Sequence, residues 1–342
     1  MPVLNINKSS PPVLITPGDP AGIGPEITLK AIAGGLRGVI VMGQISHLEL
    51  LAEHMALPLR FRTVSSDDIY ACDDKNICSV LPVNWTDMPV AGQPDQKNAQ
   101  AVISAIADAV ALAHSGSVSA IITNPISKSV LYEAGFEYPG HTEYLAALDE
   151  APLPVMMLAN PHLKAVPVTI HIPLQDVSEA LTPQLLKQTI EIIHTEMQQR
   201  FGLTAPRIAI AGLNPHAGEG GHIGSEERQM VTPLLSALRD EGLNVSGPHS
   251  ADTLFHPEAR TEYDVVVAMY HDQALIPVKT LDFYGSVNVT LGLSFIRTSP
   301  DHGTAFDRAG QFSAREDSLK AAVQMAQDMA DYQMNYQRDS SQ

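Results

Sequence analysis

The 342-residue sequence contains little cysteine, few aromatic residues and no long hydrophobic run. Its two cysteines, Cys72 and Cys78, are spaced unlike a zinc knuckle, so we expect two free thiols, as in a cytoplasmic protein. No stretch approaches the roughly 20 apolar residues of a membrane-spanning helix. The first residues also lack the charged-then-apolar pattern of an export signal. These absences predict a cytoplasmic location and no membrane partner.

Basic charge is also scarce. Lys and Arg number 21 against 38 Asp and Glu, which gives a formal net charge of −17. A nucleic-acid-binding protein normally carries a basic surface, so we expect no nucleic-acid partner. An anionic ligand would need a locally positive site in this acidic chain, and the Lys, Arg and His residues of such a site should be identifiable.

What the sequence does contain is an alternation of apolar β-type runs with amphipathic helical segments. Helical patterns cover 98–115 and 183–200, and the second begins with Thr182 at the N-cap and Pro183 at the first helical position. This alternation predicts an α/β protein in which helices cover a largely parallel sheet. The strand-like runs are 12–19, 38–44, 119–125, 165–173, 207–215, 265–272 and 286–293.

Several of these runs end in polar loops, and one of them, GLNPHAGEGGHIGSE at 212–226, holds five glycines and two histidines. In open α/β sheets, ligands bind beyond the carboxyl ends of the strands. His171, His216 and His271 each follow such a run, and three imidazoles suit a divalent metal: zinc, cobalt or manganese, or magnesium where carboxylates help. His222 could replace His216. Carboxylates that could assist are Asp252 and Asp272.

Two further groups could bind an anion. Gly140, His141 and Thr142 precede a helical run with Glu143 in its first turn, which describes either an anion-binding helix N-terminus or an ordinary Thr cap. Lys279, Asn288 and Arg297 lie in apolar sequence, where they would form either structural ion pairs or a phosphate or carboxylate pocket.

Two glycine-containing loops, at 16–27 and 299–310, complete the candidate motifs. The first has neither the GxGxxG spacing of a Rossmann fingerprint nor the GK[ST] of a P-loop. Pro25 and Glu26 suit the start of a helix there. The second loop has small and polar residues that could follow a nucleotide.

The two loops resemble the GDGIGPE and HGSAPDIAG loops of isocitrate and isopropylmalate dehydrogenases. From about residue 13 to 325, the chain more closely resembles the 4-hydroxythreonine-4-phosphate dehydrogenase family of pyridoxal phosphate biosynthesis. The motifs that carry this second resemblance are TPGDPAGIGPE, PGHTE, VMMLA, TIHIPL, GLNPHAGEGGHIG, ADTLF, AMYHDQ, VNVTLGL and RTSPDHGTA.

The resemblance implies two α/β/α domains with a cleft between them, and we expect these to be 1–138 with 278–342, and 139–277. It implies a homodimer whose metal site draws residues from both subunits. It also implies oxidation of the C3 hydroxyl of 4-phosphooxy-L-threonine by NAD or NADP, followed by decarboxylation to 3-amino-2-oxopropyl phosphate. The residues implied are His171, His216 and His271 for the metal; His141, Thr142, Lys279, Asn288 and Arg297 for the substrate; and Gly18, Asp19, His302, Gly303, Thr304 and Asp307 for the cofactor.

Several alternatives stay open at the level of sequence. Lys279 or Asp272 could accept the proton from the substrate. A sister group with nearly the same motifs oxidises 4-phosphorylated threonate or erythronate. A hydrolase with three histidine metal ligands and a phosphate-binding acyltransferase are more distant possibilities.

Overall fold

The computed structural model describes residues 11–72, 74 and 76–340, which form two compact units. One unit comprises the described residues up to Pro152 together with Leu293–Asp331. The other comprises Leu153–Gly292 together with the described residues from Tyr332 onward.

The first unit is built on a sheet in which every recorded strand pair is parallel. Its strand order is β3-β4-β2-β1-β5-β12. Parallel strands buried on both faces read as continuous apolar runs, and the VLIT and AIIT segments do so. The strands are β1 (Val13–Thr16), β2 (Val39–Gly43), β3 (Arg60–Thr63), β4 (Ile77–Pro82), β5 (Ala120–Thr123) and β12 (Ile296–Pro300).

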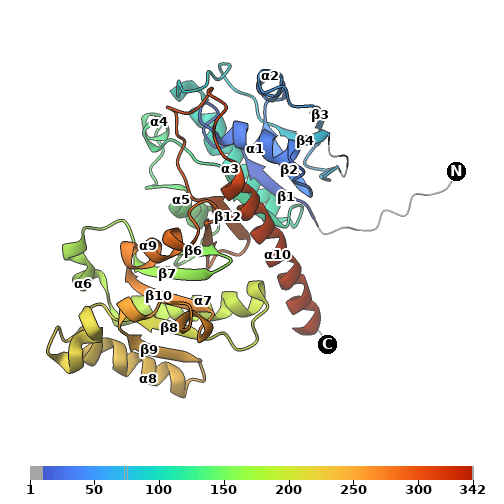
Figure 1. Cartoon of the computed structure of the whole chain (residues 1–342). Helices are drawn as coiled ribbons and strands as arrows, with labels where there is room; N and C mark the ends of the chain where they lie inside the picture. The colour runs from blue at the N-terminus through green and yellow to red at the C-terminus, as the bar shows by residue number, and fades with distance from the viewer. Residues whose placement is uncertain (1–10, 73, 75, 341–342) are drawn as a thin grey trace. The chain divides into compact units, whose positions relative to one another are not determined.

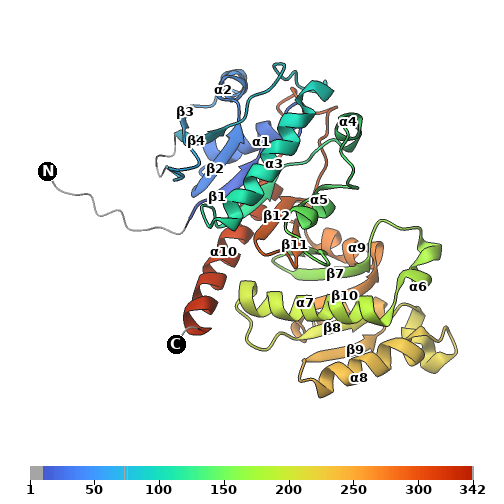
Figure 2. The ribbon, with the colours of Figure 1, turned by 180° about the vertical axis from the view of Figure 1, so that it is seen from behind.

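Helices cover both faces of this sheet. Figure 2 shows α3 across one face, and Figure 1 shows α1 and α10 on the other. The small residues along α3, such as Ala105 and Ala109, are fully buried against the strand residues Leu14 and Ile121. The helices are α1 (Gly24–Ala33), α2 (Ile45–His54), α3 (Ala99–His114), α4 (Lys128–Glu133), α5 (His141–Leu148) and α10 (Asp317–Ser340).

The second unit has a mixed sheet in the order β11-β6-β7-β10-β8-β9. Strands β11, β6 and β7 pair antiparallel, whereas β7, β10, β8 and β9 run parallel. The helix α9 packs on β7 and β10, and α7 and α8 lie on the opposite face (Figures 1 and 2). The elements are β6 (Val155–Asn160), β7 (Leu163–Thr169), α6 (Val177–Ala180), α7 (Pro183–Phe201), β8 (Ile208–Ala211), α8 (Thr232–Asp240), β9 (Val245–His249), β10 (Val265–Tyr270), α9 (His271–Leu281) and β11 (Val287–Leu291).

The predicted α/β class and each of the seven predicted strands are confirmed. Thr182 caps α7 by accepting a hydrogen bond from the Leu185 N–H, with Pro183 at the first helical position as predicted. The unit boundaries lie further along the chain than the expected 138 and 278. Helix α5 belongs to the first unit because it packs on α3, and α9 and β11 belong to the second because they pack on β7 and pair with β6.

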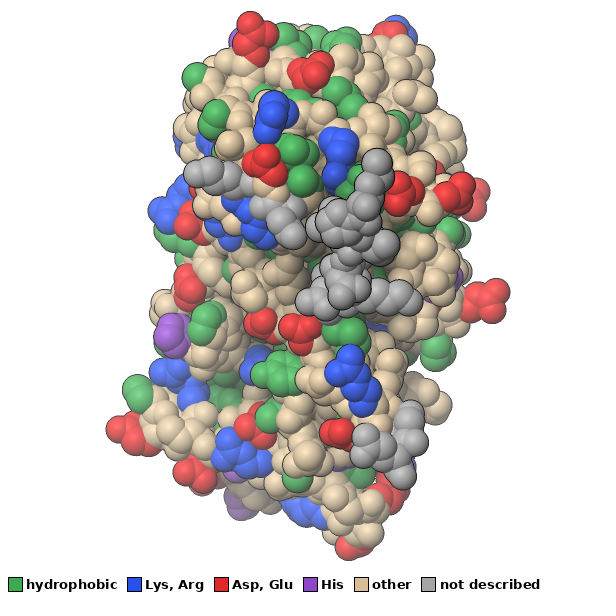
Figure 3. All heavy atoms as spheres, turned by 90° about the vertical axis from the view of Figure 1, so that its right-hand side faces the viewer, with side chains coloured by type: hydrophobic (Ala, Val, Ile, Leu, Met, Phe, Trp, Pro, Cys, Tyr) green, Lys and Arg blue, Asp and Glu red, His purple; other side chains and the backbone are tan. Residues whose placement is uncertain are grey.

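On the face drawn in Figure 3, acidic and basic side chains are interspersed, and no broad basic area is visible among the residues coloured there. In the part of the chain that the structure describes, no helix is both long and apolar enough to cross a membrane.

Candidate active site

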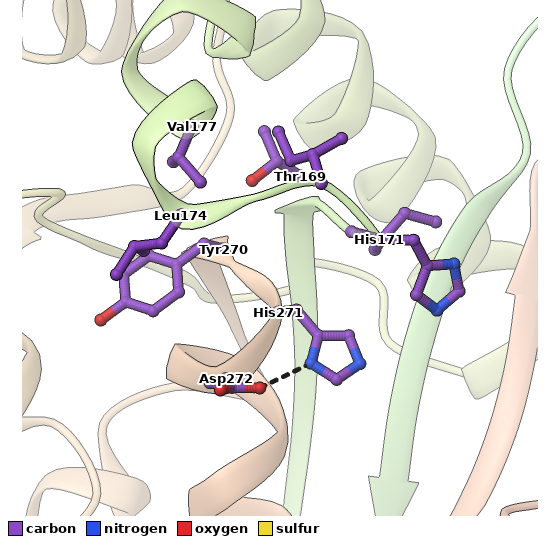
Figure 4. A pocket seen from close by; sticks show the side chains of 9 residues that line it. Thr169, His171, Leu174, Val177, Tyr270, His271 and Asp272 are labelled. Atoms are coloured by element: carbon purple, nitrogen blue, oxygen red, sulfur yellow. Dashed lines mark hydrogen bonds and ion pairs between the residues drawn. The ribbon is translucent and has the colours of Figure 1, made fainter.

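Two of the three predicted metal ligands lie side by side at the carboxyl ends of neighbouring strands. His171 follows β7 and His271 follows β10, and these two strands are parallel neighbours. The two imidazole ring centroids are 5.7 Å apart, and both rings line a pocket of about 280 Å³ (Figure 4). The pairing of β7 with β10 therefore brings together two histidines that are far apart in sequence.

Asp272 fixes the orientation of one of these rings. Its Oδ1 atom lies 2.7 Å from His271 Nδ1, as the dashed line in Figure 4 shows. A carboxylate on one ring nitrogen leaves the other nitrogen, Nε2, to face a ligand, as is usual for metal-binding histidines. The following residue, Gln273, accepts a hydrogen bond from the Met269 N–H and donates one to the Gly212 carbonyl. Gln273 thus ties the end of β10 to the loop that follows β8.

The third predicted ligand, His216, lies in that loop, on an unusual backbone. Five consecutive residues, from His216 to Gly220, have φ between 44° and 81°, and three of them are not glycine. Each non-glycine residue in this left-handed region costs roughly 1–2 kcal/mol. The buried Glu227 holds the turn, since its carboxylate accepts hydrogen bonds from both the backbone N–H and the side-chain amide of Asn214.

This left-handed turn displays the His216 side chain, which is 67% exposed, with its Nδ1 atom 3.0 Å from Glu219 Oε2. Asp252 lies near it. The Ser250 hydroxyl chiefly, and His216 to a smaller extent, lower the pKa of the Asp252 carboxyl. Each candidate carboxylate therefore lies near a different histidine: Asp252 near His216 and Asp272 beside His271.

A single chain does not assemble the predicted metal site. Among the described residues, no group of three or more His, Cys, Asp or Glu side chains is close enough to hold a metal ion. His216 is not among the residues that line the pocket of His171 and His271. Within one chain, only two of the three imidazoles, those of His171 and His271, lie together as expected. The pair fits as part of a metal site, because two imidazoles and an orienting carboxylate are suitable donors.

The candidate proton acceptors share a second pocket with His271. Lys279 lies further along α9 than Asp272 and lines a space of about 440 Å³ together with His271, Asp272 and Phe283. Its ammonium nitrogen is 5.8 Å from the centroid of the Phe283 ring. In the same unit, Asn288 on β11 has a buried Oδ1 atom with no hydrogen-bond partner in the described chain.

The remaining predicted substrate residues lie in the first unit. Arg297, on β12, is only 4% exposed, and its Nε and Nη2 atoms donate to Thr123 Oγ1 at 3.1 and 2.6 Å. Burial lowers the pKa of Arg297 to about 10, while Glu143 opposes the shift. Burial first, then the charges of Arg297 and Lys128, hold the pKa of His141 well below its usual value.

Buried positive charge beside a neutral histidine indicates an anion site. The His141 Nε2 atom is buried and has no hydrogen-bond partner in the described part of the chain. The reading of Thr142 as an ordinary N-cap is wrong, because α5 begins at His141 with Gly140 at the N-cap. The charge of Lys128 also acts here, and sequence reasoning did not single this residue out, although the TNPISK loop after β5 was a signal.

The two glycine loops predicted to bind the cofactor lie against one another in the first unit. The Ile23 N–H donates to the Thr304 carbonyl at 3.0 Å, which joins the two loops directly. Gly18 is left-handed, with φ of 65°, and a Cβ atom there would be 2.6 Å from the Pro125 carbonyl oxygen. Only glycine fits this approach.

Two polar groups in these loops are buried. Desolvation raises the pKa of the Asp19 carboxyl, which accepts a hydrogen bond from the Ala21 N–H. The Nε2 atom of His302 is buried without a partner among the described atoms, and burial lowers the pKa of this histidine. In the same loop, no atom lies within 4 Å of the position that a Cβ atom on Gly303 would occupy. The Asp307 side chain is exposed. The unpartnered Nε2 atom of His302 next to glycine backbone fits a bound nucleotide.

Comparison with known proteins decides the family. Residues 37–326 match the family described as Pyridoxal phosphate biosynthetic protein PdxA. The chain belongs to this family. Among the relatives of this PdxA-family chain, the 4-hydroxythreonine-4-phosphate dehydrogenase of Methylorubrum populi is 49% identical over 93% of this chain and 94% of its own length. The enzyme of the same name from Paracoccus denitrificans is 50% identical, over 93% and 98% respectively.

Solved structures agree with this assignment. The 4-hydroxythreonine-4-phosphate dehydrogenase of Klebsiella pneumoniae superposes with a TM-score of 0.85 at 38% identity, covering 94% of this chain and all of that one. A terephthalate 1,2-cis-dihydrodiol dehydrogenase from Burkholderia xenovorans LB400 gives 0.64 at 28% identity, covering 92% and 96%. The predicted fold and the predicted family are therefore both confirmed for this PdxA-family protein.

Proposed function

We propose that this PdxA-family protein oxidises 4-phosphooxy-L-threonine at its C3 hydroxyl with NAD or NADP. The 3-oxo acid formed loses CO₂ and takes up a proton to give 3-amino-2-oxopropyl phosphate. The observation that carries the proposal is an identity of 49% over 93% of the chain to a 4-hydroxythreonine-4-phosphate dehydrogenase. The residues present support it, since the buried guanidinium of Arg297 and the pair of histidines suit an anionic alcohol.

In this proposal, the substrate's phosphate and carboxylate are bound by the groups that the sequence singled out. Arg297 offers a planar pair of donors, which suits bidentate contact with either anion. His141 is kept neutral by burial and neighbouring charge, so its unpartnered Nε2 atom can donate or accept a hydrogen bond. Thr142, Lys279 and Asn288 complete the proposed substrate contacts.

Loss of hydride from C3 requires that the C3 hydroxyl also lose its proton. Asp272 is engaged with His271 Nδ1, which favours an orienting role for this carboxylate. We therefore assign proton acceptance to Lys279, which lines the same pocket as His271.

A divalent metal held by His171, His216 and His271 would lower the pKa of the hydroxyl and stabilise negative charge on its oxygen. The nicotinamide cofactor would accept the hydride, with its nucleotide held by Gly18, Asp19, His302, Gly303, Thr304 and Asp307.

We also propose that two copies of the chain share each metal site. His171 and His271 lie together while His216 lies elsewhere in the same unit, so a second copy would supply the missing imidazole. Apolar side chains are exposed beside the histidine pair, which fits an interface with that copy. They are Ile172, Leu174, Ile276, Phe283 and Tyr284, and Leu174 is 70% exposed.

A substrate panel tests the proposed activity. Purified protein is mixed with NAD⁺ or NADP⁺, a divalent metal and 4-phosphooxy-L-threonine, and the absorbance of the reduced cofactor is followed. We expect turnover that a chelator abolishes and added metal restores. Parallel reactions contain 4-phospho-D-threonate and 4-phospho-D-erythronate, in which a hydroxyl replaces the amine. Faster turnover of either of these would transfer the assignment to the sugar-acid group, and ester hydrolysis without cofactor reduction would indicate a hydrolase.

A further inference from the structure

A separate polar cavity lies at the opposite edge of the sheet that carries the histidine pair. It has a volume of about 210 Å³ and is lined by the residues that precede or begin β7 and β10 and by the end of α7. β7 spans Leu163–Thr169, and a strand rises about 3.3 Å per residue, so this cavity is on the order of 20 Å from His171. The cavity is therefore separate from the candidate active site. Its lining residues include Lys164, Phe201, Arg260, Tyr263 and Asp264.

Two half-buried cationic side chains line this cavity, and each has hydrogen-bonding capacity that the described chain leaves unused. Lys164 is half-buried, and its side chain makes no hydrogen bond in the described chain; its ammonium nitrogen is 5.7 Å from the Phe201 ring centroid. Burial lowers the pKa of Lys164, and Asp264 offsets part of this shift. Arg260 donates through Nη1 to the His162 carbonyl, but its buried Nε atom has no partner among the described residues.

The acidic group of the cavity is already engaged. Asp264 accepts hydrogen bonds from Arg207 Nε at 3.2 Å, from Arg207 Nη2 at 2.8 Å and from the Arg207 backbone N–H. This bidentate pairing compensates the Asp264 charge locally. Lys164 and Arg260 thus give the cavity an excess of positive charge, although the chain as a whole carries a formal charge of −17.

We propose that the cavity formed around Lys164 and Arg260 binds a small phosphate-bearing anion. A guanidinium with an unused N–H and an ammonium that line one cavity suit a tetrahedral oxyanion. The cavity is smaller than the roughly 300–1,000 Å³ of sites for drug-sized ligands, so the occupant is inorganic phosphate or a short phosphate monoester. Phe201 and Leu203 line the cavity and could contact a short carbon chain.

Calorimetric titration of the metal-loaded protein with inorganic phosphate, and separately with glycerol 3-phosphate, tests the proposal. The proposed active site also binds phosphate, so we expect two sites per chain in the parent protein. Lys164→Met and Arg260→Gln should each weaken one site at least tenfold and leave the other unchanged. Lys187→Met is the matched control, because Lys187 is an exposed lysine of the same unit that is paired with Glu241, and it should retain both sites. Preferential loss of the glycerol phosphate signal would identify a monoester as the ligand.

Crystals soaked in tungstate, a heavy-atom analogue of phosphate, locate the site directly. We expect an anomalous peak within hydrogen-bonding distance of Lys164 Nζ and Arg260 Nε. No peak there, or phosphate affinities in Lys164→Met and Arg260→Gln equal to that of the Lys187→Met control, would overturn the inference. The KM for 4-phosphooxy-L-threonine should not change in either cavity variant. A failure of the proposed dehydrogenase activity would leave the tungstate result intact, so the two hypotheses fail separately.

Discussion

His271 Nδ1 and Asp272 Oδ1 are 2.7 Å apart, and the two residues are adjacent in the first turn of α9. This contact orients the imidazole toward the pocket that His171 also lines. Asp272→Asn should keep the fold but lower metal affinity and kcat about 10- to 100-fold, the usual effect of losing such a partner. Metal content after dialysis and steady-state rates measure it. Asp240→Asn, an exposed change on α8, is the control, and equal metal content in both variants would contradict the role.

A mixed-dimer experiment tests whether two chains share the metal site. His171→Ala and His216→Ala should each be inactive and metal-poor. When the two variants are co-expressed, random pairing gives half mixed dimers with one intact site of two, so we expect about a quarter of the parent activity. Persistent inactivity of the mixture, with mixed dimers verified by two affinity tags, would place all three ligands in one chain. His222→Ala, in the same loop, is the control and should retain metal.

Arg297 should contribute mainly to substrate binding. Because it is buried, its loss would leave a desolvated anion without its partner, which typically costs about 2–4 kcal/mol, or roughly 30- to 1,000-fold in affinity. We expect Arg297→Met to raise the KM for the phosphorylated substrate by this factor. Thr123→Val removes only the hydroxyl that holds Arg297 and should have a smaller effect. An unchanged KM in Arg297→Met would remove Arg297 from the substrate site.

His47 predicts a pH dependence of stability that is independent of the active site. This residue is 3% exposed in α2, and burial lowers its pKa from 6.5 to about 4. Between these values the unfolded chain binds more protons than the folded one. Neutral His47 therefore makes its full contribution to the free energy of unfolding above about pH 6.5. This contribution, on the order of 3 kcal/mol, is lost as the pH falls toward 4.

His47→Gln should flatten this part of the stability profile. Thermal midpoints of the parent and the variant are measured from pH 7 to pH 4.5, and the difference between them should shrink as the pH falls. His54→Gln, at the exposed end of the same helix, should follow the parent throughout. A constant difference between His47→Gln and the parent would show that His47 does not titrate as proposed.

The left-handed turn offers a matched pair of glycines. Gly218 and Gly220 have φ of 81° and 65°, but a Cβ atom on Gly218 would be 2.7 Å from Glu227 Oε2, whereas nothing lies within 4 Å of one on Gly220. Gly220→Ala should cost only the conformational strain, roughly 1 kcal/mol. Gly218→Ala should also displace Glu227 and lower metal retention. Equal thermal midpoints and equal metal content for the two variants would contradict this reading.

The sequence predicted the strands and the polar loops that follow them because both depend on local patterns. Apolar runs such as VVVAMY identify buried parallel strands, and polar residues directly after them mark the ligand-binding edge. Pro183 and Thr182 likewise determined the start of α7. These features are determined within a few residues, so no knowledge of tertiary packing is needed to find them.

The sequence could not predict which candidates meet in space. His171 and His271 are brought together by the β7–β10 pairing, whereas the position of His216 depends on a left-handed turn held by Glu227 and Asn214. The extent of each unit likewise depends on which partner α5 and α9 pack against. Lys164 and Arg260, which are 96 residues apart, show no local motif and meet only in the folded sheet.

The turn that carries His216 also determines whether this loop can be reproduced in a peptide or in another protein. Outside the protein, a free chain seldom populates several successive left-handed residues, and a copy of 212–226 lacks the Glu227 carboxylate that holds the turn. A synthetic peptide copying 212–226 should therefore be unstructured and bind zinc no better than a scrambled version. A grafting effort would have to transplant Glu227 as well, because its hydrogen bonds with Asn214 maintain the shape on which the imidazole is presented.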